Sequence, residues 1–401
     1  MNPKLRPVRP EVATMNGQQV IVLRDPLGLS DRTVAVPQAL GLLLTLCDGT
    51  RDESALRAAL QVRAGIFLSP DRLAEILKRL DEALLLDNDS YREARARALD
   101  DFRRARYRPP ALAGSSYPAE PEPLAALLDG YLAAAPQGQN AGPVRGLVTP
   151  HIDYERGGAV YAEVWSRTAE SAREAEVAII LGTDHQSEGA LITLTRQSYA
   201  TPFGMLPTNN AIVAELALAL GVEAAFAEEL HHKSEHSIEL AAVWLHHVRR
   251  GSPLRLVPIL CGSFERFMAP DADPAADPVL QRFIEVLRGV LVGRRALIVA
   301  AGDLAHSGPA FGDLVPAGAA ARVRGAQADG ELIAAISRGD AAAFLAQIKA
   351  EGDRRHICGA APIYLALRLL EPVRGEPAGY AQAPADDQGS SFVSVCGVTL
   401  I

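Results

Sequence analysis

The sequence predicts an α/β protein in which a central, mostly parallel sheet is flanked by helices and preceded by a small α+β domain. The main observation is a series of short, β-branched apolar runs separated by helical stretches. These runs cover residues 147–149, 177–181, 256–260 and 297–301. They are almost continuously apolar, as strands covered by helices on both faces are. We expect antiparallel additions near residues 190–195 and 392–400.

Length and composition narrow the class of protein. A chain of 401 residues provides two or three domains, and 48% hydrophobic with 22% charged residues excludes a disordered or collagen-like chain. No apolar run approaches the roughly 18 residues of a membrane span, and the first ten residues lack the apolar segment of a signal peptide. We therefore expect a cytoplasmic protein that does not interact with membranes.

A domain boundary is expected near residues 107–114, because Pro109 and Pro110 cannot continue the arginine-rich helix before them. We therefore divide the chain into domains 1–111 and 112–401. Up to Leu112 there are 18 Lys and Arg against 15 Asp and Glu, so the larger domain carries the acidic excess. An acidic body indicates that nucleic acid is not a partner.

The first domain combines one or two strands with several helices. A strand is predicted over residues 19–24, and helices over residues 38–47, 53–64 and 70–86. Asp52 and Ser69 precede the last two helices and are expected to cap them. This pattern fits a winged-helix module.

Polar residues capable of binding a metal follow the strands of the larger domain. His151, His185, and the pair Asp303 and His306 each come directly after a predicted strand. Carboxyl ends of parallel strands share one edge of a sheet, where loops supply ligands. A lone histidine there is more often a structural hydrogen-bonding residue, but three such positions together favour a common site.

Cys358 stands just before a helix predicted over residues 362–370. A helix N-terminus lowers the pKa of a thiol, so we expect a thiolate that could bind metal. The alternative, a buried structural cysteine, is the interpretation for Cys47, Cys261 and Cys396. A covalent nucleophile at Cys358, with His306 or His356 as base, also stays open.

The segment from His231 to Glu239 is dense in titratable groups at the start of a helix. His236 and Glu239 are three residues apart, so they share a helical face and could reach a common site. His231 and His232 are expected to be solvated, and Ser234 and Ser237 are suited to cap the helix.

These motifs occur in the order that the Memo family shows, and the chain most resembles its bacterial branch called AmmeMemoRadiSam system protein B. The resemblance covers roughly residues 112–401. The residues before it are similar to PqqD-like winged-helix modules, which bind peptides. The motifs are Pro150-His151-Ile-Asp-Tyr154, Leu181-Gly-Thr-Asp-His185, Thr201-Pro-Phe-Gly204, Glu235-His-Ser-Ile-Glu239, Asp303-Leu-Ala-His306 and Ile357-Cys-Gly359.

The resemblance implies a fold similar to class III extradiol dioxygenases and a non-heme metal site. Carried over by motif, the metal ligands are His151, His185 and Cys358. The resemblance implies Fe(II), although copper and zinc also accept such ligands. The residues implied to line the pocket as catalytic candidates are Asp303, His306, His236 and Glu239, with His306 as general acid or base and Asp303 orienting it.

The implied activity is that of an iron oxidoreductase of the AmmeMemoRadiSam system. The implied partners are an AMMECR-like protein and a radical SAM enzyme, with a peptide bound by the first domain. A non-catalytic metal- or peptide-binding component of a modification system is the alternative. The family's Pro-His-Ala-Gly-Tyr reads Pro-His-Ile-Asp-Tyr here, so we expect Asp153 to accept a hydrogen bond from His151.

Overall fold

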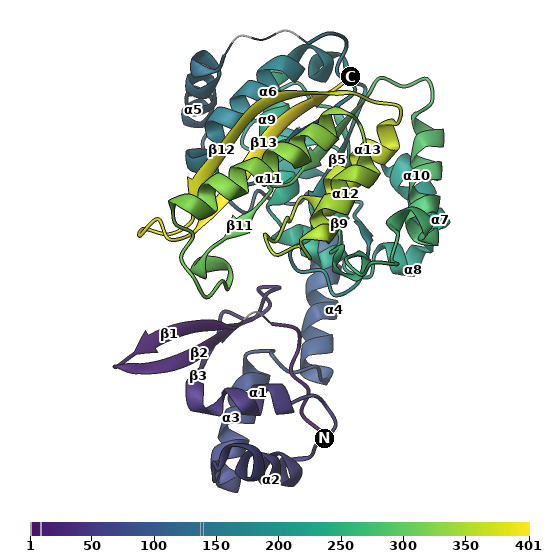
Figure 1. The fold of residues 1–401 in the computed structure, drawn as a ribbon. Helices are drawn as coiled ribbons and strands as arrows, with labels where there is room; N and C mark the ends of the chain where they lie inside the picture. The colour runs from purple at the N-terminus through teal and green to yellow at the C-terminus, as the bar shows by residue number, and fades with distance from the viewer. Residues whose placement is uncertain (1, 9, 137, 139) are drawn as a thin grey trace. The chain divides into compact units, whose positions relative to one another are not determined.

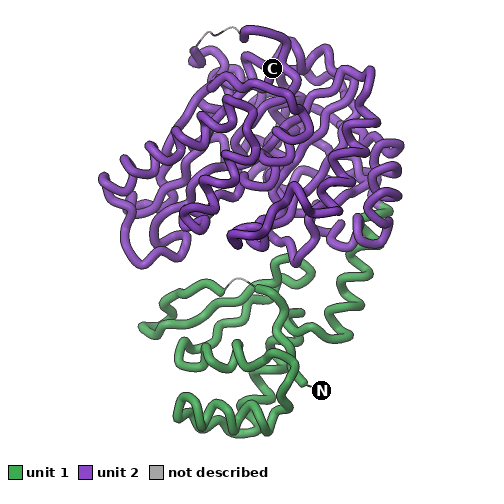
Figure 2. The backbone as a smooth tube through the Cα atoms, turned by 45° about the vertical axis from the view of Figure 1, so that its right-hand side comes forward, with its two compact units in different colours: residues 1–104 green, residues 105–401 purple. Residues whose placement is uncertain are grey.

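The computed structural model describes residues 2–8, 10–136, 138 and 140–401. Its contacts divide the chain into two compact units, Met1–Arg104 and Ala105–Ile401 (Figure 2). Each unit has its own hydrophobic core. The segment 105–111, which the proline signal assigned to the first domain, is part of the second unit.

The first unit is a three-stranded antiparallel sheet with helices. The strands β1 (Glu11–Met15), β2 (Gln18–Arg24) and β3 (Thr33–Pro37) lie in chain order, with β2 in the middle. The predicted caps are confirmed, because Asp52 accepts a hydrogen bond from the N–H of Ala55 and Ser69 from that of Arg72. The helices are η1 (Gln38–Leu40), α1 (Gly41–Leu46), α2 (Glu53–Ala64), α3 (Pro70–Glu82) and α4 (Asp89–Arg104).

An eight-stranded mixed sheet forms the centre of the second unit, which confirms the predicted α/β fold (Figure 1). Its order is β11-β13-β4-β10-β5-β9-β6, with β12 paired to β13. The inner strands β4, β10, β5 and β9 are parallel, while β6 pairs antiparallel with β9 and β13 pairs antiparallel with β4. The strands are β4 (Gly146–Thr149), β5 (Val177–Thr183), β6 (Ile192–Leu194), β9 (Arg255–Cys261), β10 (Ala296–Ala301), β11 (His306–Ser307), β12 (Gly375–Pro384) and β13 (Phe392–Leu400).

Helices cover both faces of this sheet (Figure 1). Alternate strand residues enter different cores: Leu147 joins one, while Val148 joins the other. This explains the continuously apolar strands. One face carries α5 (Pro121–Ala134), α6 (Tyr154–Glu174) and α9 (Ser237–Val248), and the other carries α7 (Asn210–Leu220), α10 (Pro278–Leu291), α11 (Ala319–Ser337), α12 (Ala341–Ala350) and α13 (Ala360–Leu370).

Shorter elements complete the second unit. A separate two-stranded ribbon pairs β7 (Tyr199–Thr201) with β8 (Gly204–Leu206), and α8 (Val222–Ala225) leads into η2 (Glu229–Lys233). In the described part of the chain, no helix is long and apolar enough to cross a membrane.

Candidate metal centre

His151 follows β4 and is held from both sides at the edge of the sheet. Its backbone N–H donates to Asp303 Oδ1 (2.8 Å), and its ring Nδ1 donates to the carbonyl oxygen of Ala301 (3.1 Å). An imidazole that donates through Nδ1 has its lone pair on Nε2. The ring is 2% exposed, and this burial, together with His185 and His236, holds the pKa of His151 well below 6.5. His151 is therefore neutral near pH 7.

Two sets of possible metal ligands meet at this ring. The first, which we call the histidine cluster, is His151, His185 and His236, and the second, the cysteine cluster, is His151, Asp303 and Cys358. In each cluster the ligand atoms lie within 4.8 Å of one another. The three predicted ligands are divided between the clusters: His151 belongs to both, His185 to the first and Cys358 to the second, and the predicted pocket residues His236 and Asp303 complete them.

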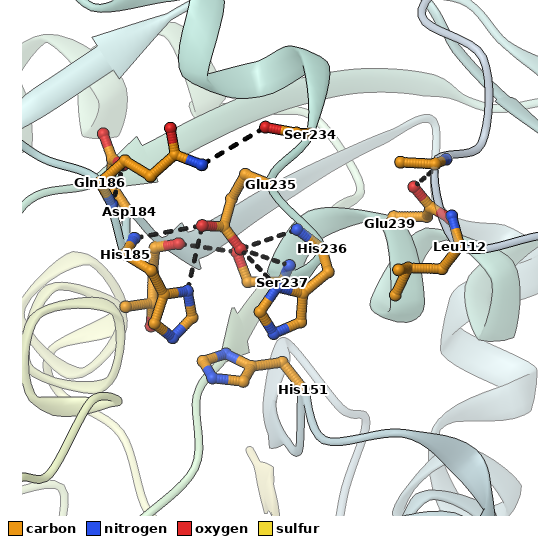
Figure 3. Close-up of polar contacts among 12 residues, drawn as sticks. Leu112, His151, Asp184, His185, Gln186, Ser234, Glu235, His236, Ser237 and Glu239 are labelled. Atoms are coloured by element: carbon orange, nitrogen blue, oxygen red, sulfur yellow. Dashed lines mark hydrogen bonds and ion pairs between the residues drawn. The ribbon is translucent and has the colours of Figure 1, made fainter. Parts of the chain in front are cut away.

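The histidine cluster is closely packed (Figure 3). The ring centroid of His151 lies 4.9 Å from that of His185 and 5.4 Å from that of His236. The rings of His185 and His236 are stacked, with 4.9 Å between centroids and 13° between planes. Their side chains are 25% and 36% exposed, so the cluster is open to solvent on their side.

Glu235 orients both exposed rings, and the sequence reasoning did not single it out. One carboxylate oxygen lies 3.0 Å from Nδ1 of His185, and the other lies 3.1 Å from Nδ1 of His236. The carboxylate also accepts from the backbone N–H groups of His185, His236 and Ser237 (3.1, 2.7 and 2.9 Å). A glutamate directly before a histidine, at the predicted start of a helix, was the available signal.

The charges of this arrangement support one another. Burial would raise the pKa of Glu235, but the two histidines outweigh it and hold that pKa well below its usual value. Burial would lower the pKa of His236, yet the hydrogen bond and charge of Glu235 raise it overall. Glu235 is therefore an ionised carboxylate that fixes two imidazoles, as carboxylates behind metal-binding histidines do.

The cysteine cluster lies at the end of β10. Cys358 Sγ is 3.2 Å from His151 Nε2 and 3.6 Å from the carbonyl oxygen of Asp303, while Asp303 Oδ2 is 3.6 Å from the same Nε2. Burial and the nearby Asp303 raise the pKa of the Cys358 thiol well above 9.0. The predicted lowering of this pKa is therefore wrong, because burial has the largest effect on the thiol and acts in the opposite direction. Burial likewise raises the pKa of Asp303.

Comparison with known proteins places this site in a family. A family model described as Memo-like protein matches residues 108–398. The chain belongs to the Memo family. A MEMO1 family protein from Aquifex aeolicus is 26% identical to this chain over 292 residues, which cover 73% of each chain. A MEMO1 family protein from Thermus thermophilus is 30% identical over 256 residues, which cover 63% of this chain and 70% of that one. A MEMO1 family protein from Methanopyrus kandleri is 29% identical over 212 residues, which cover 50% of this chain and 70% of that one.

Glu239 lies within the Memo-like region, but the structure does not bring it to the imidazoles. Its carboxylate accepts from Arg108, from the backbone N–H groups of Ala111 (2.7 Å) and Leu112 (2.8 Å), and from the hydroxyl of Tyr117. Figure 3 shows it pointing away from the rings. The prediction that His236 and Glu239 share a helical face is wrong, because His236 precedes the first turn of α9.

His306 belongs to neither the histidine cluster nor the cysteine cluster. Its Nδ1 donates to the carbonyl oxygens of Leu304 (3.2 Å) and His356 (3.1 Å), and its ring meets that of Phe311 edge to face. Burial lowers the pKa of His306 to about 4. The ring is therefore neutral at pH 7, with its lone pair on Nε2.

Other sequence expectations for the region are corrected. Asp153 does not bond to His151: it caps α6 through the N–H of Arg156 and pairs with that arginine's guanidinium. His231 and His232, expected to be solvated, are 2% and 0% exposed. The start of α9 is capped by the carboxylate of Glu235 rather than by a serine hydroxyl.

Proposed function

We propose that this Memo-family protein holds a redox-active first-row metal around His151, and that the metal is Fe(II). The observation that carries the proposal is the position of His151 in both clusters, with its Nδ1 bonded to the protein and its Nε2 directed at Cys358 and Asp303. A fixed, neutral imidazole such as that of His151, beside a thiol and a carboxylate, is typical of transition-metal sites.

The residues present fit such a metal. His151, His185 and Cys358 are the proposed ligands, and His236 and Asp303 offer further donor atoms. Nitrogen and sulfur donors accept Fe(II), Cu(I) or Zn(II), and a bound cation stabilises the thiolate that burial disfavours. When bound, the metal would supply Lewis-acid or electron-transfer chemistry to a substrate.

The protein's own groups define how a substrate could approach and exchange a proton. His151 is buried, whereas His185 and His236 are partly exposed, so access is from the side of these two rings. His306 is neutral near pH 7, and its Nε2 suits a proton acceptor rather than a proton donor. Asp303 fixes His151 through its backbone N–H instead of hydrogen bonding to His306.

The test is the metal content of protein purified without oxygen, measured by mass spectrometry. We expect nearly one iron per chain, lost in both His151→Ala and Cys358→Ser and retained in His247→Gln, a histidine that pairs with Asp129 instead. Stoichiometric zinc or copper would keep the site and change its chemistry. No metal after anaerobic reconstitution would contradict the proposal.

A second candidate function is peptide or partner binding by the first unit. In the described residues, β1 and β3 each pair only with β2, so each is an edge strand. Edge strands bind extended peptides by adding a strand to the sheet. The proposed occupants are a substrate peptide, an AMMECR-like protein or a radical SAM enzyme. If fragment 1–111 folds but binds none of these in purified form, this role is excluded.

A further inference from the structure

A second group of ionisable side chains lies directly before His185 in the chain. It consists of Asp184, Glu228 and His231, whose ligand atoms lie within 4.8 Å of one another, and we call it the Asp184 cluster. The three residues are 4%, 8% and 2% exposed. We propose that the Asp184 cluster binds a divalent first-row cation, separate from the metal proposed at His151.

The contacts of the Asp184 cluster show a built site. His231 Nδ1 lies 2.9 Å from Asp184 Oδ2 and 3.7 Å from Glu228 Oε2. Asp184 Oδ1 lies 3.1 Å from the same nitrogen and accepts from the N–H of Gln186 (3.0 Å). Glu228 Oε1 accepts from the N–H groups of Glu188 (3.2 Å) and Ala190 (3.1 Å). The loop after β5 therefore folds around these carboxylates.

One buried oxygen in this arrangement lacks a hydrogen bond. Glu228 Oε2 is inaccessible to solvent and accepts no hydrogen bond from the residues that the structure describes. His231 Nδ1 carries at most one proton, and its shorter contact gives that proton to Asp184. Leaving a buried carboxylate oxygen without a hydrogen bond is costly. Since Glu228 Oε2 is 3.7 Å from His231 Nδ1, too far for a hydrogen bond, another group is needed to compensate its charge.

A divalent cation is the group that satisfies all three residues. In the described part of the chain, no lysine or arginine forms an ion pair with Asp184 or Glu228. With Nδ1 of His231 deprotonated, two carboxylates and one imidazole would offer three ligand atoms and two negative charges. A third carboxylate, that of Glu188, is near enough to act on His231.

The donor set also defines the class of cation. Two carboxylate oxygens and one imidazole nitrogen suit Mn²⁺, Fe²⁺ or Zn²⁺, whereas the thiol of the cysteine cluster favours softer ions. Mn²⁺ is therefore a suitable probe, because carboxylate oxygens suit it, whereas a thiolate selects softer ions.

The experiment titrates Mn²⁺ alone into the full chain carrying His151→Ala and Cys358→Ser, with free Mn²⁺ measured by electron paramagnetic resonance. We expect saturable binding of one Mn²⁺ per chain. Adding Glu228→Gln should weaken it by about 10-fold or more, because the amide keeps the shape but loses the charge. The matched control is Glu223→Gln on α8, an exposed glutamate, which should leave the affinity unchanged.

Circular dichroism and thermal unfolding of each variant separate lost binding from lost folding. Absence of saturable Mn²⁺ binding in the folded double variant would overturn the inference, and so would equal affinity after Glu228→Gln. Because two of the three proposed ligands of the His151 site, including the one shared by both clusters, are removed in this background, the outcome is independent of whether iron is found there.

Discussion

At the scale of single residues, Glu235 contributes most to the order of the proposed metal site. Its two oxygens orient the rings of His185 and His236, and the same oxygens accept three backbone N–H groups. One side chain thus determines two imidazole orientations and the start of α9.

Replacing Glu235 with glutamine should weaken metal binding by about 10- to 100-fold. The amide keeps one acceptor oxygen but presents an N–H group to one of the two imidazole N–H groups. Competition against a chelator gives the affinity. Glu215→Gln on α7, an exposed position, is the control, and an unchanged affinity in Glu235→Gln would contradict the assigned role.

His232 provides a prediction on pH. Its Nδ1 accepts from the hydroxyl of Tyr199 (2.7 Å) and its Nε2 donates to the carbonyl oxygen of Thr193 (3.1 Å), so the ring is buried and neutral. Burial lowers the pKa of His232 to about 3, against 6.5 for an exposed histidine. Between these values the unfolded chain binds the extra proton, so the free energy of unfolding must fall as the pH drops below 6.5.

Urea unfolding at pH 7, 6 and 5 measures this effect. In His232→Gln the side chain keeps one acceptor and one donor but does not titrate. The free energy of unfolding of this variant should therefore fall less than that of the wild type as the pH drops from 7 to 5. Parallel losses in both proteins would show that the other buried histidines account for the whole dependence.

The sequence was informative where a side chain follows a strand, and less so where distant residues decide its direction. His151, His185 and Asp303 were predicted to converge because parallel strands end at one edge. Glu239 was misjudged because its partner Arg108 comes from far along the chain. No periodicity reveals such a pairing.

At the scale of elements, the junction between β10 and α13 depends on two glycines in close contact. A Cβ at Gly359 would lie 2.7 Å from the carbonyl oxygen of Asp303, and Gly302 packs against Gly359 in the same way. This close approach brings Cys358 beside Asp303 and His151.

Gly359→Ala should therefore displace Cys358 and lower both metal content and the melting temperature. Gly330→Ala is the matched control, because its Cβ in α11 would meet nothing within 4 Å. It should stabilise the protein by about 0.5–1 kcal/mol through helix propensity. Calorimetry and metal analysis check both, and normal iron content in Gly359→Ala would refute the argument.

Strands were predicted best where they are buried on both faces. Residues 147–149, 177–181, 256–260 and 297–301 fall within β4, β5, β9 and β10. β12 was not foreseen, since glycine and proline interrupt its pattern and its pairing with β13 shifts between Pro377 and Tyr380. The exposed β1 has no apolar alternation that would identify it.

At the scale of the whole molecule, the second unit should fold and bind metal alone if it keeps residue 108. The Arg108 side chain is fully buried, where it pairs with Glu239 and donates to the carbonyl oxygens of His232 (2.9 Å) and Glu235 (2.8 Å). Removing one partner of such a buried ion pair costs about 3–5 kcal/mol.

Fragment 105–401 should therefore retain the metal and the stability of this unit, whereas fragment 112–401 should be less stable by several kcal/mol. Chemical denaturation of both fragments and of the full chain measures the difference. Equal stability of the two fragments would show that Arg108 is dispensable.

The direct succession of Asp184 and His185 has a thermodynamic consequence. Asp184 belongs to the Asp184 cluster and His185 to the histidine cluster, so a single peptide bond joins a proposed ligand of one cation to a proposed ligand of the other. Any factor by which one ion changes the affinity for the other must hold equally in the opposite direction. The supply of one metal would then regulate how firmly the protein retains the other.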